Sequence, residues 1–460
     1  MDKTLWSEIE KFDLDNAFEE YGFSTRLAFE NSWTIYFTKT AILEYKKFMY
    51  LAAISNEMVS PSEIVDIVWH QHLIFTKSYS DLCTILSKKI EHIPSTHNKA
   101  EFDKFKRAKE ATKNIYEMNF GSQPKEFWEY QDPMNSLKLD ISNLDLTMLK
   151  MIFLGSFLLL IFPLSLLLKP VLVQIGNPDF VWYYIFLFVI GTILLMRFVK
   201  RSCMELIQDL KNKLIISHLT PFELVYLQKD RLDFVIHGVV NNLAETKKVE
   251  VVGNKLKLIN ATLTNNQYEN CVIKIMEEYD FMPYSQLSQI IKSKPLYRQL
   301  ENAVGKIRDT IVNSKPFLNI FKIVLLVFGL LLSIGFSRII IGVSRGKAVW
   351  ILISIMIIIG IISNHYFKKM TNYLFLEAVY FSFKQERVAT NAGYDWQWNY
   401  FFHGAIAVSI IPLTSYTSSI FNSNGNRSDG GSSCGSSCSS SSSSSCGSSC
   451  GSSCGGCGGD

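Results

Sequence analysis

The stretch MIFLGSFLLLIFPLSLLL at residues 151–168 contains no charged side chain. At about 1.5 Å of rise per helical residue, it is long enough to cross most of the roughly 30 Å of hydrocarbon in a bilayer. A second uncharged run, FVWYYIFLFVIGTILLM, follows at residues 180–196. The two runs predict a pair of membrane-spanning helices joined as a hairpin, and they favour a mainly α, polytopic helical membrane protein.

Further apolar runs occur late in the chain. IVLLVFGLLLSIGF at residues 323–336, which extends through SRIIIGV, and AVWILISIMIIIGIIS at residues 348–363 predict a second hairpin. A weaker run, YFFHGAIAVSIIPLTSY at residues 400–416, contains His403 and Pro412. It is either a fifth crossing or a buried core helix, and the basic, Trp-containing linker before it favours the crossing.

The flanks of these runs predict an orientation. The N-terminus has no apolar segment of the kind that follows the basic start of a secretory signal, so residues 1–147 are expected in the cytosol. Basic residues gather at the run ends that would face the same side, namely Arg197, Lys200, Arg201, Lys315, Lys322, Lys368 and Lys369. This distribution follows the positive-inside rule and predicts a multi-pass protein of the cell membrane with a cytosolic N-terminus.

The turn SRIIIGVSRGKAV at residues 337–349 departs from that rule, because Arg338, Arg345 and Lys347 would face outward. A re-entrant or interfacial third segment is the alternative. Arg338 is either an arginine paired within the apolar layer or, with its basic neighbours, the mark of a membrane boundary. Gly335 and Gly342 would then allow close helix packing.

The predicted organisation has seven parts. They are a cytosolic helical domain (1–147), a transmembrane hairpin (148–199), a cytosolic winged-helix-like and helical region (200–316), a second hairpin (317–365), a linker helix (366–399), the fifth apolar run (400–416) and a disordered tail (417–460). The fold class is therefore a helical membrane protein with an all-α N-terminal domain and a small α+β middle domain.

In the N-terminal domain, SPSEIVDIVWHQHLIF at residues 60–75 predicts a helix start. Ser60 is placed as the N-cap, Pro61 fits the first turn, and Glu63 completes a capping box. On this helix His70 and His72 point almost oppositely, because two residues rotate a helix by about 200°.

The pair His70 and His72, with Asp66, suggests a divalent-metal site. Metal ions in proteins need three or four converging ligands, so His92, His97 or Cys83 would have to complete a site that contains Asp66 and His70. The alternative is a buried, hydrogen-bonded histidine packed beside Trp69.

The segments VDIVWHQHLIFTKSYSDLC (65–83) and ATKNIYEMNFGSQPKEFWEYQDP (111–133) resemble the domain shared by plant and bacterial glycine-rich domain proteins. The matching positions are Asp66, Trp69, His70, His72, Tyr79, Cys83, Thr112, Tyr116, Phe120, Gly121, Pro124 and Trp128. The resemblance implies an all-helical domain without a defined activity, so it transfers no catalytic residue.

The middle region contains two helices followed by two strands joined by GNK, within residues 219–260. This order is typical of a winged helix. Its second helix offers Asp233, His237, Asn241 and Asn242 rather than a basic face, so we expect no nucleic acid as a partner.

The segments LTPFELVYL, GFSRIIIGVSRGKAV (335–349) and a Gly/Ser/Cys tail resemble, in this order, a family of uncharacterised bacterial membrane proteins. Its glycine and arginine pattern is matched by Gly335, Arg338, Gly342, Arg345, Gly346, Lys347 and Val349. Ala348 replaces the expected proline, and the family has no known chemistry to transfer.

The tail GGSSCGSSCSSSSSSSCGSSCGSSCGGCGG at residues 430–459 lacks the apolar residues that a core requires. Its thiols are Cys434, Cys438, Cys446, Cys450, Cys454 and Cys457. In the cytosol they would be reduced and able to bind soft metal ions, whereas outside the cell they would form disulfides. A low-complexity spacer is the alternative.

Hydrophobic residues make up 48% of the 460 residues and charged ones 19%, and the net charge is only +4. No phosphate-binding loop, nucleophile elbow or HExxH motif occurs, so an enzyme is not the first expectation and no small-molecule substrate is identified. The sequence predicts an interaction or assembly protein whose partners are the lipid bilayer and other proteins. The alternative is a metal-binding or thiol-redox membrane protein that uses the N-terminal histidines or the tail.

Overall fold

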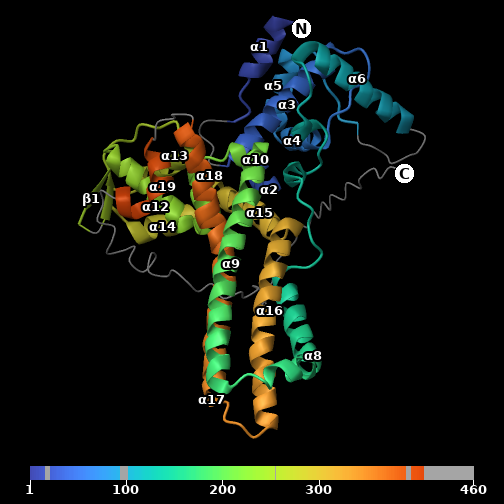
Figure 1. Cartoon of the computed structure of the whole chain (residues 1–460). Coiled ribbons are helices and arrows are strands. Elements are labelled where there is room, and N and C mark those ends of the chain that lie inside the picture. Colours follow the sequence, from blue (N-terminus) through green and yellow to red (C-terminus); the bar gives the residue numbers. More distant parts are fainter. Residues whose placement is uncertain (16–20, 94–101, 254, 390–394, 409–460) are drawn as a thin grey trace, which may run out of the picture. The chain divides into compact units, whose positions relative to one another are not determined.

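The structure is a computed structural model of the whole chain, and it is mostly helical (Figure 1). It describes the residues outside 16–20, 94–101, 254, 390–394 and 409–460. All described residues belong to one compact unit, residues 1–416. The six cysteines of the tail and residues 409–416 of the fifth apolar run lie outside the described residues.

The N-terminal region is helical, as predicted. Its elements are α1 (Lys3–Lys11), α2 (Phe23–Asn31), α3 (Ile35–Ile54), α4 (Glu63–Ile74), α5 (Thr76–Ile85), α6 (Phe102–Phe120), α7 (Lys125–Trp128) and the short 3₁₀ helix η2 (Pro133–Leu137). Within this region the longest buried stretch lies on α3, where Phe48, Met49, Tyr50 and Leu51 are all enclosed. The helix therefore forms the centre of this part of the core.

Helix α4 starts later than predicted. Ser62, not Ser60, is the N-cap, and its Oγ accepts a hydrogen bond from the Val65 amide at 3.2 Å. The Ser60 amide instead donates to Thr112 Oγ1 at 2.8 Å. The prediction failed because this contact with distant α6 keeps Ser60 outside the helix.

Four described helices are long and apolar enough to cross a membrane. They are α8 (Leu146–Leu172), α9 (Asn177–Lys211), α16 (Lys315–Ser344) and α17 (Trp350–Asn372), the last continuing through the π-helix η3 (Tyr373–Ala378) into α18 (Val379–Ala389). Short turns join α8 to α9 and α16 to α17, as the two predicted hairpins require (Figure 1). α16 runs without a break, so the re-entrant alternative for the third segment finds no support.

The long helices extend beyond the predicted spans. α9 continues to Lys211, twelve residues past the predicted limit at residue 199, because a buried stripe of Cys203, Leu206, Ile207 and Leu210 packs on the rest of the unit. The predicted linker helix 366–399 is helical through Ala389 and continuous with α17, and Phe375 of η3 is fully buried.

The middle region has the predicted helices and hairpin, together with a short third strand. Its elements are α10 (Leu214–Ser217), α11 (Pro221–Lys229), α12 (Leu232–Glu245), β1 (Val249–Val252), β2 (Lys255–Leu258), α13 (Gln267–Glu277), β3 (Met282–Pro283), α14 (Tyr284–Ser293) and α15 (Pro295–Val312). The sheet is antiparallel in the order β1-β2-β3, with Val251 opposite Leu256 and Leu256 opposite Met282. β3 escaped prediction because two residues carry no alternating pattern.

The described start of the fifth apolar run lies on a helix that packs against the middle region. α19 (Trp396–Val408) packs on α11 and α12, where Tyr400, Phe401 and Phe402 are buried. The Tyr400 hydroxyl donates to the Phe234 carbonyl of α12 at 2.7 Å. Tyr400, Phe401 and Phe402 therefore belong to the core of the described unit, because their aromatic side chains pack against protein. The helix is interrupted at Gly404, whose φ is 69°, and a fifth crossing over 400–416 stays a prediction.

Candidate metal centre

Helix α4 places its two histidines in opposite surroundings. His72 is fully buried, with Nδ1 at 2.8 Å from the Tyr45 hydroxyl and Nε2 at 3.0 Å from Ser78 Oγ. Burial lowers the pKa of His72 to about 4, so its ring is neutral near pH 7. The structure therefore gives His72 a core role and separates it from Asp66 and His70, with which it was predicted to bind metal.

Three other groups converge at the opposite side of the helix. Asp66 and His70 are four residues apart on α4, hence on one face, and His92 approaches from the loop after α5. Asp66 Oδ2 lies 3.3 Å from His70 Nε2, and Asp66 Oδ1 lies 2.9 Å from His92 Nε2. One donor atom from each residue lies within 4.8 Å of the other two, so this cluster can hold a metal ion.

The cluster lies at the surface and is partly open to solvent. The His70 side chain is 56% exposed, that of Asp66 32% and that of His92 15%. In a tetrahedral zinc site with bonds of about 2.0–2.2 Å, donor atoms are about 3.3 Å apart. Small side-chain movements would bring these three donors to that spacing.

The loop that carries His92 is tied down at two points. Lys88 Nζ donates to the carbonyls of Ala52 and Ser55, at 2.8 and 2.9 Å. The Tyr79 hydroxyl donates to the Ile90 carbonyl, two residues before His92. These contacts explain how a residue outside any helix reaches α4.

Trp69 and Tyr79, two motif residues, connect α4 to this loop. Trp69 Nε1 donates to the Tyr79 hydroxyl at 3.2 Å, and the Trp69 ring meets the His92 ring edge-to-face at a centroid distance of 4.6 Å. Burial raises the pKa of Tyr79 to about 12, so its hydroxyl keeps the proton that it donates. Trp69 was predicted to pack beside a buried histidine, and the histidine that its ring contacts this closely is the partly exposed His92.

Cys83 does not join the cluster. It is a half-buried free thiol on α5, and it lies near the Tyr79 and Tyr45 hydroxyls on the core side of that helix. His97, the third suggested partner, lies outside the described residues.

The second half of the motif holds a buried carboxylate that sequence reasoning missed. Glu44 of α3 accepts hydrogen bonds from the Tyr116 hydroxyl at 2.8 Å and from Trp128 Nε1 at 2.7 Å, and Lys47 pairs with it at 2.8 Å. The available signal was a lone acidic residue among the apolar residues of 38–55. These contacts give Tyr116 and Trp128 a structural role.

Arg338 is buried at the turn between α8 and α9. Its guanidinium donates to the carbonyls of Leu172 and Ile175 and to Asn177 Oδ1, the last two at 2.7 and 2.9 Å, and it faces the Phe180 ring at 5.1 Å. The guanidinium is therefore paired, at the turn of the first hairpin, and both interpretations of Arg338 stay predictions. Arg345, by contrast, is the exposed C-cap of α16.

The two glycines of this segment pack closely. A Cβ on Gly335 would collide with Met356 Sδ and lie 2.6 Å from the Tyr184 hydroxyl, and one on Gly342 would collide with Val349. Close packing was the role predicted for both residues.

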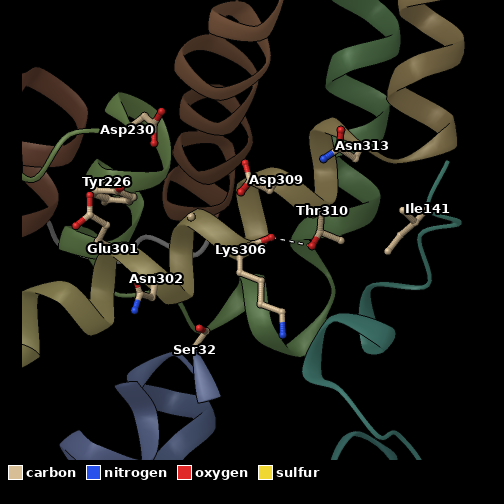
Figure 2. A pocket seen from close by; sticks show the side chains of 11 residues that line it. Ser32, Ile141, Tyr226, Asp230, Glu301, Asn302, Lys306, Asp309, Thr310 and Asn313 are labelled. Atoms are coloured by element: carbon tan, nitrogen blue, oxygen red, sulfur yellow. Dashed lines mark hydrogen bonds between the residues drawn. The ribbon is translucent and has the colours of Figure 1, made fainter. Parts of the chain in front are cut away.

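A second polar feature is a pocket of about 550 Å³ on α15, near Ser32, Ile141 and the end of α11 (Figure 2). Asp230 and Asp309 both line it, and burial together with the charge of Asp230 raises the pKa of Asp309. The pocket is wide open, and its polar groups are largely engaged with the protein; Lys306, for example, pairs with Asp132 at 2.7 Å. The histidine cluster is the better candidate because its donor atoms converge on one point.

Comparison with protein-family models, with curated proteins and with solved structures found no match to this chain. The geometry therefore defines only a class, a mostly helical protein with four described helices able to cross a membrane. The two family resemblances and the winged-helix-like arrangement stay predictions.

Proposed function

We propose that this chain is an integral membrane protein whose N-terminal helical region binds a divalent transition-metal ion through Asp66, His70 and His92. The observation that carries the proposal is the convergence of these three donor groups within 4.8 Å. Two imidazoles and a carboxylate are ligands that zinc and other first-row metals accept. The alternative is that these three side chains only stabilise the fold by pairing with one another, which requires no metal.

A metal bound there would keep open coordination positions. Three protein ligands leave at least one place for water or an anion, and the exposure of His70 leaves that place accessible. Structural zinc sites usually have four protein ligands, whereas sites with three are typical of reactive centres. The arrangement thus supports an exchangeable ion rather than a buried structural one.

The membrane anchor would be the four long helices, with the bilayer as their partner. We place the protein in the cell membrane with its N-terminus in the cytosol, because the basic run ends follow the positive-inside rule. An interaction or assembly role with protein partners is compatible with this arrangement and stays a prediction, as does the absence of a nucleic-acid partner. The soft-metal role of the tail cysteines also stays a prediction.

The test uses the full-length protein, purified in detergent, with the six tail cysteines replaced by serine so that they bind no metal. Metal-free protein is titrated with Zn²⁺ and with Co²⁺, and bound metal is counted by elemental analysis after desalting. We expect about one ion per chain, and loss of binding in His70→Ala and in His92→Ala. His218→Ala, which changes the exposed C-cap histidine after α10, is the control and should bind as the parent does.

The variant His72→Gln separates two possible sets of ligands. Asp66 and His70 would be joined by His92 in one set and by His72 in the other. We expect His72→Gln to keep the metal but to melt at a lower temperature, because it disturbs the contacts with Tyr45 and Ser78. A folded parent protein that binds no stoichiometric metal would refute the proposal.

A further inference from the structure

We infer that Tyr79 is a positioning residue for the proposed metal centre, fixing His92 at α4 through a chain of hydrogen bonds from Trp69 to the Ile90 carbonyl. The inference rests on the proposed function. It assigns a task to two residues, Trp69 and Tyr79, that the sequence motif contains but does not explain.

Of the three proposed ligands, only His92 lies outside a helix. Asp66 and His70 are held at i and i+4 by the backbone of α4, so their spacing is built into the helix. His92 follows α5 by seven residues and belongs to no helix or strand. Its position must therefore be set by side-chain contacts.

The Tyr79 hydroxyl supplies the nearest contact. It accepts from Trp69 Nε1 and donates to the Ile90 carbonyl, so both of its hydrogen-bonding functions are used. Trp69 lies between the ligands Asp66 and His70 in the sequence, on the same helix. The chain of bonds therefore runs from the helix that carries two ligands to the loop that carries the third.

Further contacts restrict the position of the loop and the rotation of the His92 ring. The Ile90 side chain is buried, which anchors the loop on the core side. The Trp69 ring covers one edge of the His92 ring, and His70 meets the same ring at a centroid distance of 4.4 Å. The His92 imidazole thus has little room to rotate away from Asp66.

Loss of the Tyr79 hydroxyl should free the loop that carries His92 without leaving a cavity in the core. Tyr79→Phe keeps the ring and removes the bonds to both Trp69 and Ile90. Residues that orient metal ligands typically change metal affinity 10–100-fold when mutated. We expect Co²⁺ affinity to fall at least tenfold in Tyr79→Phe, with an altered visible absorption spectrum per bound ion.

Tyr116→Phe is the matched control. It also removes a buried tyrosine hydroxyl from the N-terminal region, one bonded to Glu44 rather than to the His92 loop. We expect it to lower the melting temperature while Co²⁺ affinity and spectrum stay as in the parent. All titrations are done well below the lowest melting temperature, in the background without tail cysteines.

The outcomes separate the two proposals. If the parent binds no metal, the proposed function fails. If the parent binds metal and Tyr79→Phe shows the same affinity and spectrum, the metal site stands and the inference about Tyr79 is wrong. Should Tyr79→Phe not fold, Trp69→Phe removes the first hydrogen bond of the chain, and unchanged Co²⁺ binding in that variant would also overturn the inference.

Discussion

His70 and His72 are two residues apart on α4, and the helix rotation of about 200° between them decides which one can meet solvent. That rotation follows from the sequence once the helix is recognised, and it predicted the opposite orientations of the two side chains, one exposed and one buried, that the structure shows. The identity of the third ligand did not follow. His92 was one of three distant candidates, because a contact between α4 and a loop is set by Tyr79 and Lys88 rather than by spacing.

His237 of α12, which like His72 is a buried histidine, makes stability depend on pH. Its Nδ1 lies 3.1 Å from the Tyr400 hydroxyl of α19, and burial lowers its pKa to about 4, below the ordinary value near 6.5. The unfolded chain therefore binds a proton more readily than the folded one between pH 6.5 and 4. Stability from this residue is complete above pH 6.5 and is lost as the pH falls toward 4.

We expect the contribution of His237 to fall by about 2 kcal/mol between pH 7.5 and 5. The measurement compares melting temperatures of the detergent-purified parent and His237→Asn across this range. The parent should lose more stability than the variant, since His72 and all other groups titrate in both. Parallel curves for the two proteins would contradict the expected pH effect of His237.

At the scale of elements, the apolar runs predicted the four long helices but not how they pack. α9, α16 and α17 meet at Gly335, where the absence of a side chain lets Met356 and the Tyr184 hydroxyl approach the helix backbone. The Tyr184 hydroxyl also donates to the Leu331 carbonyl of α16 at 2.9 Å. One glycine therefore sets the distance between three helices.

Gly335→Ala should destabilise the bundle by about 1–3 kcal/mol, the usual cost of forcing a methyl group into a packed core. Gly360→Ala on α17 is the control, because a Cβ there would meet nothing within 4 Å. Both changes improve helix propensity equally, so the difference in melting temperature in detergent measures the steric effect. Equal melting temperatures would show that this contact is not tight in solution.

At the scale of the whole molecule, the number of crossings determines which segments share a side of the membrane. The packing of α19 on α11 and α12 ties residues 396–408 to the middle region. Four crossings by α8, α9, α16 and α17 would put that region on the same side as the N-terminal helices and the turn 345–349 on the other.

Single cysteines introduced at exposed positions test this arrangement in a chain without its nine native cysteines. Each variant is treated with a membrane-impermeant maleimide in intact cells and after lysis. We expect Met118→Cys of α6 and His403→Cys of α19 to be labelled under the same condition. Lys347→Cys should be labelled under the opposite one. A fifth crossing over 400–416 would put the tail on the side of Lys347, so labelling of a chain that keeps Cys434 as its one cysteine in the same way as Lys347→Cys would support that crossing. The absolute reactivity of Met118→Cys tests whether the N-terminus is cytosolic.

The sequence by itself determined the local features of this protein: four long apolar helices, the helical N-terminal region, and the order of helices and hairpin in the middle region. These follow from composition and periodicity, which act over a few turns of chain. The tertiary structure alone decided the burial of α19, the start of α4 at Ser62, the carboxylate network of Glu44, and the meeting of His92 with Asp66 and His70. Each of these depends on contacts between residues far apart in the chain, and the free energy of such contacts is not encoded in local pattern.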